Sequence, residues 1–344
     1  MPENKIQTVM ESLNQALHAM METDRRVVVI GEDILDPYGG AFKISRGLSA
    51  RFPERVLSTP ISEAAIVGLA TGMAMRGFRP IVEIMFGDFL ALAADQIINH
   101  ATKFEWMYNH QVQVPLVVRT PMGGRRGYGP THSQSLEKHF LGVPGLWVVA
   151  PSFLGSPGAL LQKATLGLDA PVLFVENKSC YSQSLVDSAP GLVANVYDDD
   201  GVQFPTHYLH HENVTASDGL IFCHGGMVQF CLDSMIKLRE CEGLFMDIIV
   251  FSQLSPVPVR TLRRILEEWQ PKFCIYVEEN NVLAGWSSEI MAQVDEIFSG
   301  LLLRSSVRHL RIGSEDVPIA SSRYLETLTL PQVEDIADRI TNAF

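Results

Sequence analysis

The chain has 344 residues, of which 47% are hydrophobic and 19% are charged. This composition supplies enough apolar side chains for two buried cores and argues against intrinsic disorder. The formal net charge of −12 leaves no excess of lysine and arginine to neutralise nucleic-acid phosphates or anionic lipid. We therefore expect neither a nucleic acid nor a membrane surface as a partner.

No apolar run approaches the roughly 20 residues that a membrane-spanning helix needs. The N-terminal residues 1–17 show neither a signal-peptide core nor an arginine-rich transit pattern, so we expect a cytoplasmic protein. The cysteines are scattered and never spaced as CxxC, which excludes a disulfide framework and a zinc site. The histidines of HYLHH (207–211) lack a carboxylate or cysteine at ligand spacing, so no metal site is predicted there.

Short runs of β-branched residues alternate with helical patterns over the first half of the chain. These runs begin at residues 27, 79, 114, 146 and 171, and each is apolar on both faces, as a strand covered on two sides must be. The segments 88–109 and 153–168 have helical spacing. The alternation predicts a parallel sheet with right-handed crossovers, in a first α/β domain over residues 1–185.

Residues 186–217 break this rhythm with Pro, Gly, Ser and three consecutive aspartates, which predicts a linker that can include a short strand. The α/β pattern then resumes. Strands are predicted at 218–226, 245–251 and 272–280, and helices near 227–241, after Pro258 and from Ala284. We expect a second, smaller α/β domain over residues 218–344.

Residues 59–75, TPISEAAIVGLATGMAM, place one carboxylate, Glu63, at the start of an otherwise small and apolar helix. An acid in a first helical turn is stabilised by the helix dipole by roughly 0.3–1 kcal/mol, which is the simplest explanation. However, Gly68 and Gly72 each cost about 1 kcal/mol relative to Ala inside a helix. With Ala64 they form a face that another backbone can approach closely, from within this chain or from a partner. Such packing would take Glu63 out of water. A carboxyl group that is removed from water tends to hold its proton, and it can then donate a hydrogen bond to a ring nitrogen.

Several motifs occur in order along the chain: IGED, GGAFKISRGL, TPISEA, RPIVEIMFGDF, DQIIN, THSQS and VPGLWVVAPS, followed by GLIFCHGG, YVEENNVLAGWSSEI and DVPIASSRYLE. In these motifs the chain resembles the beta subunit of the thiamine-diphosphate-dependent first component of 2-oxo acid dehydrogenase complexes, of the pyruvate, branched-chain or acetoin type. The resemblance implies a parallel-sheet pyrimidine-binding domain and a C-terminal transketolase-like domain. It also implies an alpha2-beta2 heterotetramer, in which the alpha subunit holds the diphosphate and magnesium and this chain holds the aminopyrimidine ring.

The resemblance also implies roles for four residues. Glu63 matches the glutamate that hydrogen-bonds a pyrimidine nitrogen, Phe89 matches the aromatic residue that packs on the ring, and Glu32 matches a second acid near the ring. His132 matches the active-site histidine that handles substrate and acyl transfer to a lipoyl group, and its usual pKa suits proton transfer near neutral pH. From the residues alone, Phe89 equally fits a core position, Glu32 a solvated loop acid and His132 a surface loop.

Two departures from the family pattern bear on ligands. The chain has no GDG motif with a downstream asparagine for the diphosphate and magnesium, so we expect it to need the alpha subunit to hold the cofactor. In the loop that corresponds to the family's structural potassium site, KATLGLDAPV, Gly167 and Leu168 replace polar residues and Asp169 alone remains. These replacements argue against a bound potassium ion, and no metal is assigned to this chain.

Arg125 and Arg126 lie just before His132, where two guanidinium groups can clamp a phosphate or carboxylate of a substrate or carrier. Solvated surface arginines are the alternative. Three functions follow: decarboxylation of a pyruvate-like 2-oxo acid with acyl transfer to the lipoyl group of an acyltransferase, transfer of a two-carbon unit from a ketose phosphate or 2-oxo acid to an acyl carrier protein, and a non-catalytic structural subunit.

Overall fold

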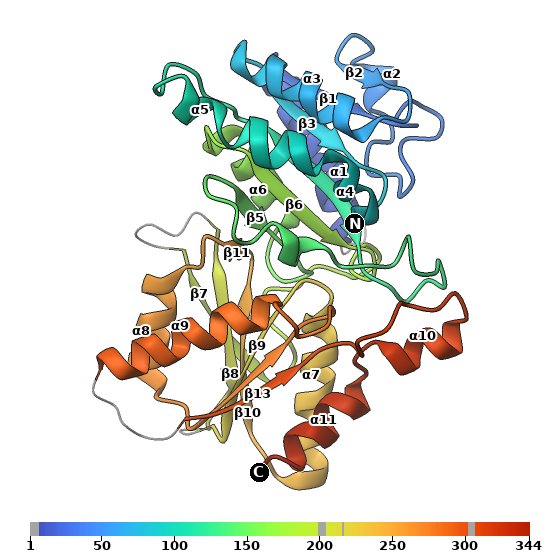
Figure 1. Cartoon of the computed structure of the whole chain (residues 1–344). Helices are drawn as coiled ribbons and strands as arrows, with labels where there is room; N and C mark the ends of the chain where they lie inside the picture. Colours follow the sequence, from blue (N-terminus) through green and yellow to red (C-terminus); the bar gives the residue numbers. More distant parts are fainter. Residues whose placement is uncertain (1–6, 199–203, 215–216, 302–306) are drawn as a thin grey trace, which may run out of the picture. The chain divides into compact units, whose positions relative to one another are not determined.

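A computed structural model describes residues 7–198, 204–214, 217–301 and 307–344 (Figure 1). The chain forms two compact α/β units. The first consists of Met1–Met122 with His139–Leu185, and the second of Gly123–Lys138 with Val186–Phe344. The second unit is about as large as the first, whereas the sequence predicted a smaller second domain. The difference arises because Gly123–Lys138 and the segment expected as a linker both belong to the second unit.

The first unit contains a parallel sheet, as predicted. Its strands are β1 (Val27–Gly31), β2 (Val56–Ser58), β3 (Arg79–Glu83), β4 (Val117–Met122), β5 (Trp147–Val149) and β6 (Val172–Asn177). They lie in the order β5-β6-β4-β3-β1-β2, and every neighbouring pair among them is parallel. Among these strands only β2 was not predicted, because just two of its residues, Val56 and Leu57, are apolar and polar residues flank them.

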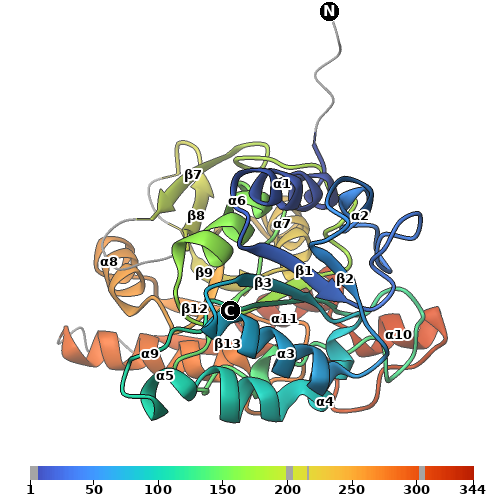
Figure 2. The same ribbon diagram turned by 90° about the horizontal axis from the view of Figure 1, so that it is seen from above.

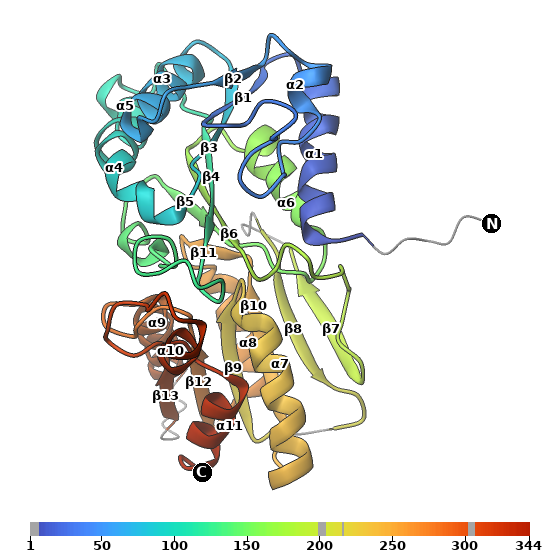
Figure 3. The same cartoon turned by 90° about the vertical axis from the view of Figure 1, so that its right-hand side faces the viewer.

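Helices cover both faces of this sheet, as Figures 2 and 3 show. The helices α1 (Val9–Thr23) and α6 (Pro157–Gln162) lie on one face, and α3 (Glu63–Met75), α4 (Leu90–Asp95) and α5 (Phe104–Met107) on the other. The short helix α2 (Leu48–Arg51), the 3₁₀ turn η1 (Gly87–Phe89) and the π-helical turns η2 (Gln96–Ala101) and η4 (Lys163–Gly167) complete the unit. The start of α1 is fixed by a capping box between Thr8 and Glu11.

The second unit contains a mixed sheet. Its strands are β7 (Leu192–Tyr197), β8 (Thr206–His211), β9 (Gly219–His224), β10 (Met246–Phe251), β12 (Phe273–Val277) and β13 (Arg308–Ile312), in the order β13-β12-β9-β10-β8-β7. The strands β13, β12, β9 and β10 are parallel, whereas β8 and β7 run antiparallel to their neighbours. The short strand β11 (Gln253–Ser255) follows β10.

The strands β7 and β8 lie inside residues 186–217, where the sequence predicted a linker. The sequence allowed one short strand there but not a pair of strands: the apolar run of β7, LVANVY, is short and is interrupted by Asn195, and β8, THYLHH, has no apolar run. The strand β7 is largely exposed along its length, and β8 is mostly buried although three of its six residues are histidines. Pairing with β10 supports β8, and this contact between distant residues leaves no local pattern.

The helices of the second unit are α7 (Met227–Lys237) with the π-helical turn η5 (Leu238–Glu242), α8 (Val259–Trp269), α9 (Trp286–Gly300), α10 (Arg323–Thr329) and α11 (Val333–Thr341). The helix α7 packs with α11 on one face of the sheet, and α8 packs with α9 on the other (Figure 3). Within the described ranges, no helix has both the length and the apolar composition needed to cross a membrane.

Candidate functional site

Three predicted site residues lie after three neighbouring strands of the first unit. Glu32 directly follows β1, Glu63 begins α3 after β2, and Phe89 ends η1 after β3. Because β2, β1 and β3 are adjacent and parallel, their carboxyl ends meet at one edge of the sheet. This edge is the usual ligand-binding position in a parallel α/β sheet.

Glu63 is the first residue of α3 and is only 4% exposed, as expected from the apolar helix that follows it. The face of that helix formed by Ala64, Gly68 and Gly72, which has no large side chains, has two kinds of surroundings. A Cβ atom at Gly68 would lie 2.9 Å from Oε1 of Gln96, so this part of the face packs within the chain. A Cβ at Gly72 would meet nothing within 4 Å, so the rest of the face is open among the described residues.

Glu32 is 6% exposed and accepts a hydrogen bond from the backbone N–H of Ser62. Burial, and then the nearby Glu63 carboxylate, raise the pKa of Glu32. Within the part of the chain that the structure describes, its buried Oε1 atom has no hydrogen-bond partner. A buried carboxylate oxygen without a partner is costly, which marks this position as a place where a ligand can donate a hydrogen bond.

Phe89 is partly exposed and ends a series of aromatic rings in the first unit. The Phe89 ring packs edge-to-face on Phe86 at 5.9 Å, Phe86 packs on Phe42 at 5.8 Å, and Phe42 packs on Tyr181 at 5.3 Å, all between ring centroids. One edge of Phe89 is therefore fixed by other rings. Such packing holds an aromatic side chain in one orientation toward a flat ligand.

Sequence reasoning missed an ionic cluster in the core of the first unit. Arg119 on β4 forms two hydrogen bonds with Glu176 on β6, at 2.8 and 2.7 Å, and a short ion pair with Glu83 on β3. Burial lowers the pKa of Arg119, but the two carboxylates outweigh it and raise the pKa above its usual value. Tyr181 Oη donates to Glu176 at 2.7 Å. A signal was present in the sequence, because three neighbouring apolar strands carry the charged residues Glu83, Arg119 and Glu176 within or at the end of their apolar runs.

His132 lies in the loop Gly123–Lys138, which belongs to the second unit. The loop is held there by carboxylates: Gly124 N donates to Glu279 at 2.6 Å, and the backbone N–H groups of Arg125 and Gly127 donate to Glu326 at 2.7 and 2.8 Å. The His132 side chain is partly exposed, and its Nδ1 lies 3.0 Å from Oγ1 of Thr131. Sequence reasoning did not identify Glu279 and Glu326, because they are distant from the loop along the chain.

The guanidinium of Arg125 is engaged within the second unit. It donates to the carbonyl oxygen of Pro331 at 2.7 Å and lies 3.8 Å above the centroid of the Phe230 ring. The backbone of Arg125 is left-handed, with φ of 70°, which turns the side chain toward these partners. Arg125 therefore holds its own loop, contrary to the predicted substrate clamp, and Arg126 is the exposed member of the pair.

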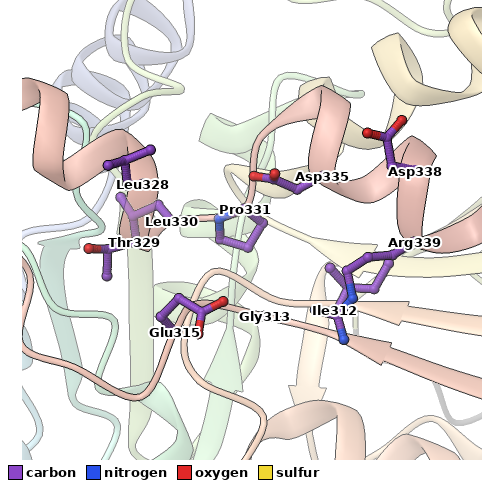
Figure 4. A pocket seen from close by; sticks show the side chains of 10 residues that line it. All are labelled: Ile312, Gly313, Glu315, Leu328, Thr329, Leu330, Pro331, Asp335, Asp338 and Arg339. Atoms are coloured by element: carbon purple, nitrogen blue, oxygen red, sulfur yellow. The ribbon is translucent and has the colours of Figure 1, made fainter.

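A pocket of about 200 Å³ in the second unit contains none of the predicted site residues (Figure 4). It is lined by the end of β13, the end of α10 and the first turns of α11. Two of its charged groups already have partners, because Asp335 accepts the backbone N–H of Gln332 at 3.0 Å and Arg339 donates to the Arg311 carbonyl at 3.1 Å. The pocket is smaller than the usual ligand site, so we assign it no role.

Comparison with known proteins identifies the family of the chain. Residues 5–183 match the family model described as the transketolase pyrimidine-binding domain. The chain is 36% identical over 334 residues to the pyruvate dehydrogenase E1 component subunit beta-1 of Arabidopsis thaliana, covering 96% of this chain and 88% of that protein. It is 30% identical to the 3-methyl-2-oxobutanoate dehydrogenase subunit beta of Mycobacterium tuberculosis, covering 96% and 90%.

A second bacterial relative is the acetoin:2,6-dichlorophenolindophenol oxidoreductase subunit beta of Cupriavidus necator, at 31% identity with 95% of this chain and 94% of that protein covered. Among solved structures, a split-gene transketolase described as an inactive beta4 tetramer has a TM-score of 0.69 at 19% identity, with 97% of both chains covered, and shows the fold alone. The chain belongs to the family of beta subunits of the thiamine-diphosphate-dependent E1 component of 2-oxo acid dehydrogenases. Members of this family bind thiamine diphosphate together with an alpha subunit.

Proposed function

We propose that this chain is the catalytic beta subunit of a 2-oxo acid dehydrogenase. In an alpha2-beta2 heterotetramer it would decarboxylate a pyruvate-like 2-oxo acid and pass the acyl unit to a lipoyl carrier. The observation that carries the proposal is the pair of buried carboxyl groups, Glu32 and Glu63, at the carboxyl edge of adjacent parallel strands. The unpartnered Oε1 of Glu32 supports it further.

These residues fit an aminopyrimidine ring. Glu63 would hydrogen-bond a ring nitrogen, Phe89 would pack on the ring, and Oε1 of Glu32 would accept a hydrogen bond at this edge. Thiamine diphosphate, when bound, supplies the nucleophilic carbon of the reaction. The alpha subunit would hold the diphosphate and magnesium, and His132 would move a proton to or from the substrate.

An exposed apolar surface supports the need for another subunit. Ile61 is 81% exposed, Leu69 on α3 is 52% exposed and Leu92 on α4 is 61% exposed, beside the open Gly72. The helices α3 and α4 pack against each other, so Leu69 and Leu92 belong to one helical layer, and Ile61 lies two residues before α3. Apolar patches of this kind commonly mark protein interfaces. We assign the patch to a neighbouring subunit of the heterotetramer.

The direct test is decarboxylation by the chain co-purified with an alpha subunit, measured with an artificial electron acceptor. We expect Glu63→Gln to lower kcat by a factor of about 10² or more, because it removes a group that holds a proton in the reaction. Glu54→Gln, at an exposed glutamate, is the matched control and should keep full activity. Full activity of Glu63→Gln would contradict the proposal. Comparison of kcat/KM for pyruvate, 3-methyl-2-oxobutanoate and acetoin identifies the substrate.

Two other functions have less support. Transfer of a two-carbon unit to an acyl carrier protein rested partly on a pair of free guanidinium groups, and the guanidinium of Arg125 is engaged by Pro331. Intact-protein mass spectrometry of an acyl carrier protein incubated with the assembled subunits and a ketose phosphate or 2-oxo acid distinguishes the two functions. Only the two-carbon transfer function loads the acyl carrier protein, whereas the dehydrogenase loads a lipoyl carrier. A non-catalytic subunit would not need a glutamate that binds the cofactor. Calorimetry of the assembled complex tests this function: tight binding of thiamine diphosphate that depends on Glu63 argues against it.

A further inference from the structure

The loop around Asp169 encloses a side chain of the protein itself. Nη1 of Arg79 donates to the carbonyl oxygens of Thr165 and Leu168, at 2.8 Å each, and its Nη2 donates to Oδ1 of Asp169 at 2.6 Å. Arg79 is 9% exposed, so the guanidinium is held inside this loop. All four residues belong to the first unit.

The oxygens that surround Arg79 are of the kind that hold a dehydrated potassium ion. Backbone carbonyl oxygens replace the hydration shell of K⁺ in proteins. Here the Thr165 and Leu168 carbonyls lie at the C-terminal end of the helix formed by α6 and η4, where unpaired carbonyls carry a partial negative charge. This end of a helix favours a cation of any kind, and a guanidinium supplies both the charge and directed donors.

The resemblance to the family associates this loop with a structural potassium ion, but the residues present do not fit one. Gly167 and Leu168 offer no side-chain oxygen, and the carboxylate of Asp169 is paired with Arg79. A potassium ion on the same oxygens would lie against the guanidinium, and two like charges at such a distance repel each other. The loop therefore already contains its cation.

We infer that Arg79 is the resident cation of the Thr165–Asp169 loop and replaces potassium there. The position of Arg79 is fixed by the sheet, because it begins β3 and its backbone N–H donates to the Arg26 carbonyl at 2.9 Å. The loop precedes β6, so the guanidinium ties the amino end of β3 to the amino end of β6 across β4. Glu32 and Glu63 lie at the carboxyl ends of the strands. The inference therefore concerns stability and is independent of the proposed reaction.

The first test is thermal unfolding of the full chain in the chlorides of potassium, sodium and tetramethylammonium at equal ionic strength. We expect the same Tm in all three, because the cation of the loop is covalently part of the chain. A saturable rise of Tm that is specific for potassium would overturn the inference. This test needs no variant, so it does not depend on whether a substituted chain folds.

The second test removes the guanidinium. We expect Arg79→Ala to lower Tm by roughly 5 °C, since charged hydrogen bonds to buried carbonyls are lost, and potassium to restore part of the loss. Arg76→Ala, at an exposed arginine three residues away, should change Tm little and show no response to potassium. If Arg79→Ala had the Tm of Arg76→Ala, or responded to potassium no more than the wild type, the loop would not be a cation site and the inference would be wrong.

Discussion

Glu137 is a buried carboxyl group whose ionisation is strongly affected by the fold. It begins the turn η3 (Glu137–His139) and is 1% exposed, and its Oε2 atom has no hydrogen-bond partner in the described ranges of the chain. Burial first, and then the carboxylates of Glu278 and Glu279, raise its pKa from 4.5 to about 8. At neutral pH the folded protein therefore holds a proton on Glu137 that the unfolded chain releases.

This proton gives stability a definite pH dependence. Between about pH 4.5 and pH 8 the folded state binds one proton more than the unfolded state, so Glu137 lowers the free energy of unfolding by about 1.4 kcal/mol for each pH unit of rise. We expect Glu137→Gln to remove this slope and to gain about 2–3 kcal/mol relative to the wild type between pH 5 and pH 7. Urea unfolding at several pH values measures the effect, with Glu54→Gln as the exposed control. Parallel profiles for wild type and Glu137→Gln would show that Glu137 is ionised in the fold.

At the scale of elements, Arg119 joins β3, β4 and β6 through Glu83 and Glu176. Replacing it with methionine leaves two buried carboxylates without a counter-charge, and we expect a loss of about 3–5 kcal/mol in the free energy of unfolding. The triple variant with Glu83→Gln and Glu176→Gln should recover part of this loss, because the unpaired charges are gone. Denaturant unfolding measures both variants. A change below about 1 kcal/mol in Arg119→Met would mean that the ion pairs add nothing to stability.

The contact of α1 with α6 depends on a glycine. A Cβ atom at Gly158 would lie 2.5 Å from the carbonyl oxygen of Ser12, so a side chain there must push the two helices apart. We expect Gly158→Ala to destabilise the chain by about 1–3 kcal/mol. Gly72→Ala is a matched control in an open helix position, and it should stabilise the isolated chain by up to about 1 kcal/mol. Thermal unfolding of the two variants should therefore show shifts of Tm in opposite directions.

The strands and helices that could be predicted from the sequence are those with a local pattern. The strands β1, β3, β4, β5 and β6 are buried along most of their length. Each of them was predicted from an apolar run, and such a run is visible in its own residues without knowledge of distant contacts. The strand β8 could not be predicted, because its burial depends on pairing with β10 some forty residues later. The same reason applies to the candidate site. Burial of Glu63 follows from its apolar helix, whereas the binding of Arg125 to Pro331 and of Arg79 to Leu168 joins residues far apart in the sequence.

At the scale of the whole molecule, the apolar patch on α3 and α4 leads to a prediction about assembly. We expect Leu69→Lys to leave the stability of the isolated chain unchanged and to weaken its association with the alpha subunit, because a charge would be buried in the interface. Leu283→Lys is the control, since Leu283 is 70% exposed and lies in the second unit, away from this patch along the chain. Sedimentation of the co-expressed subunits measures the effect. Equal assembly of both variants would assign the patch to another role.

The anchoring of the His132 loop determines where segments of this chain can be replaced by those of a relative in a chimera. Gly123–Lys138 follows a strand of the first unit, yet it is bound by Glu279 and Glu326 of the second. A chimera joined at residue 185 would therefore combine the loop of one parent with the carboxylates of the other. Two separate stretches, 123–138 and 186–344, must be inherited together for the loop to keep its shape. Recombination of this chain with a relative thus needs three junctions instead of one to preserve the loop.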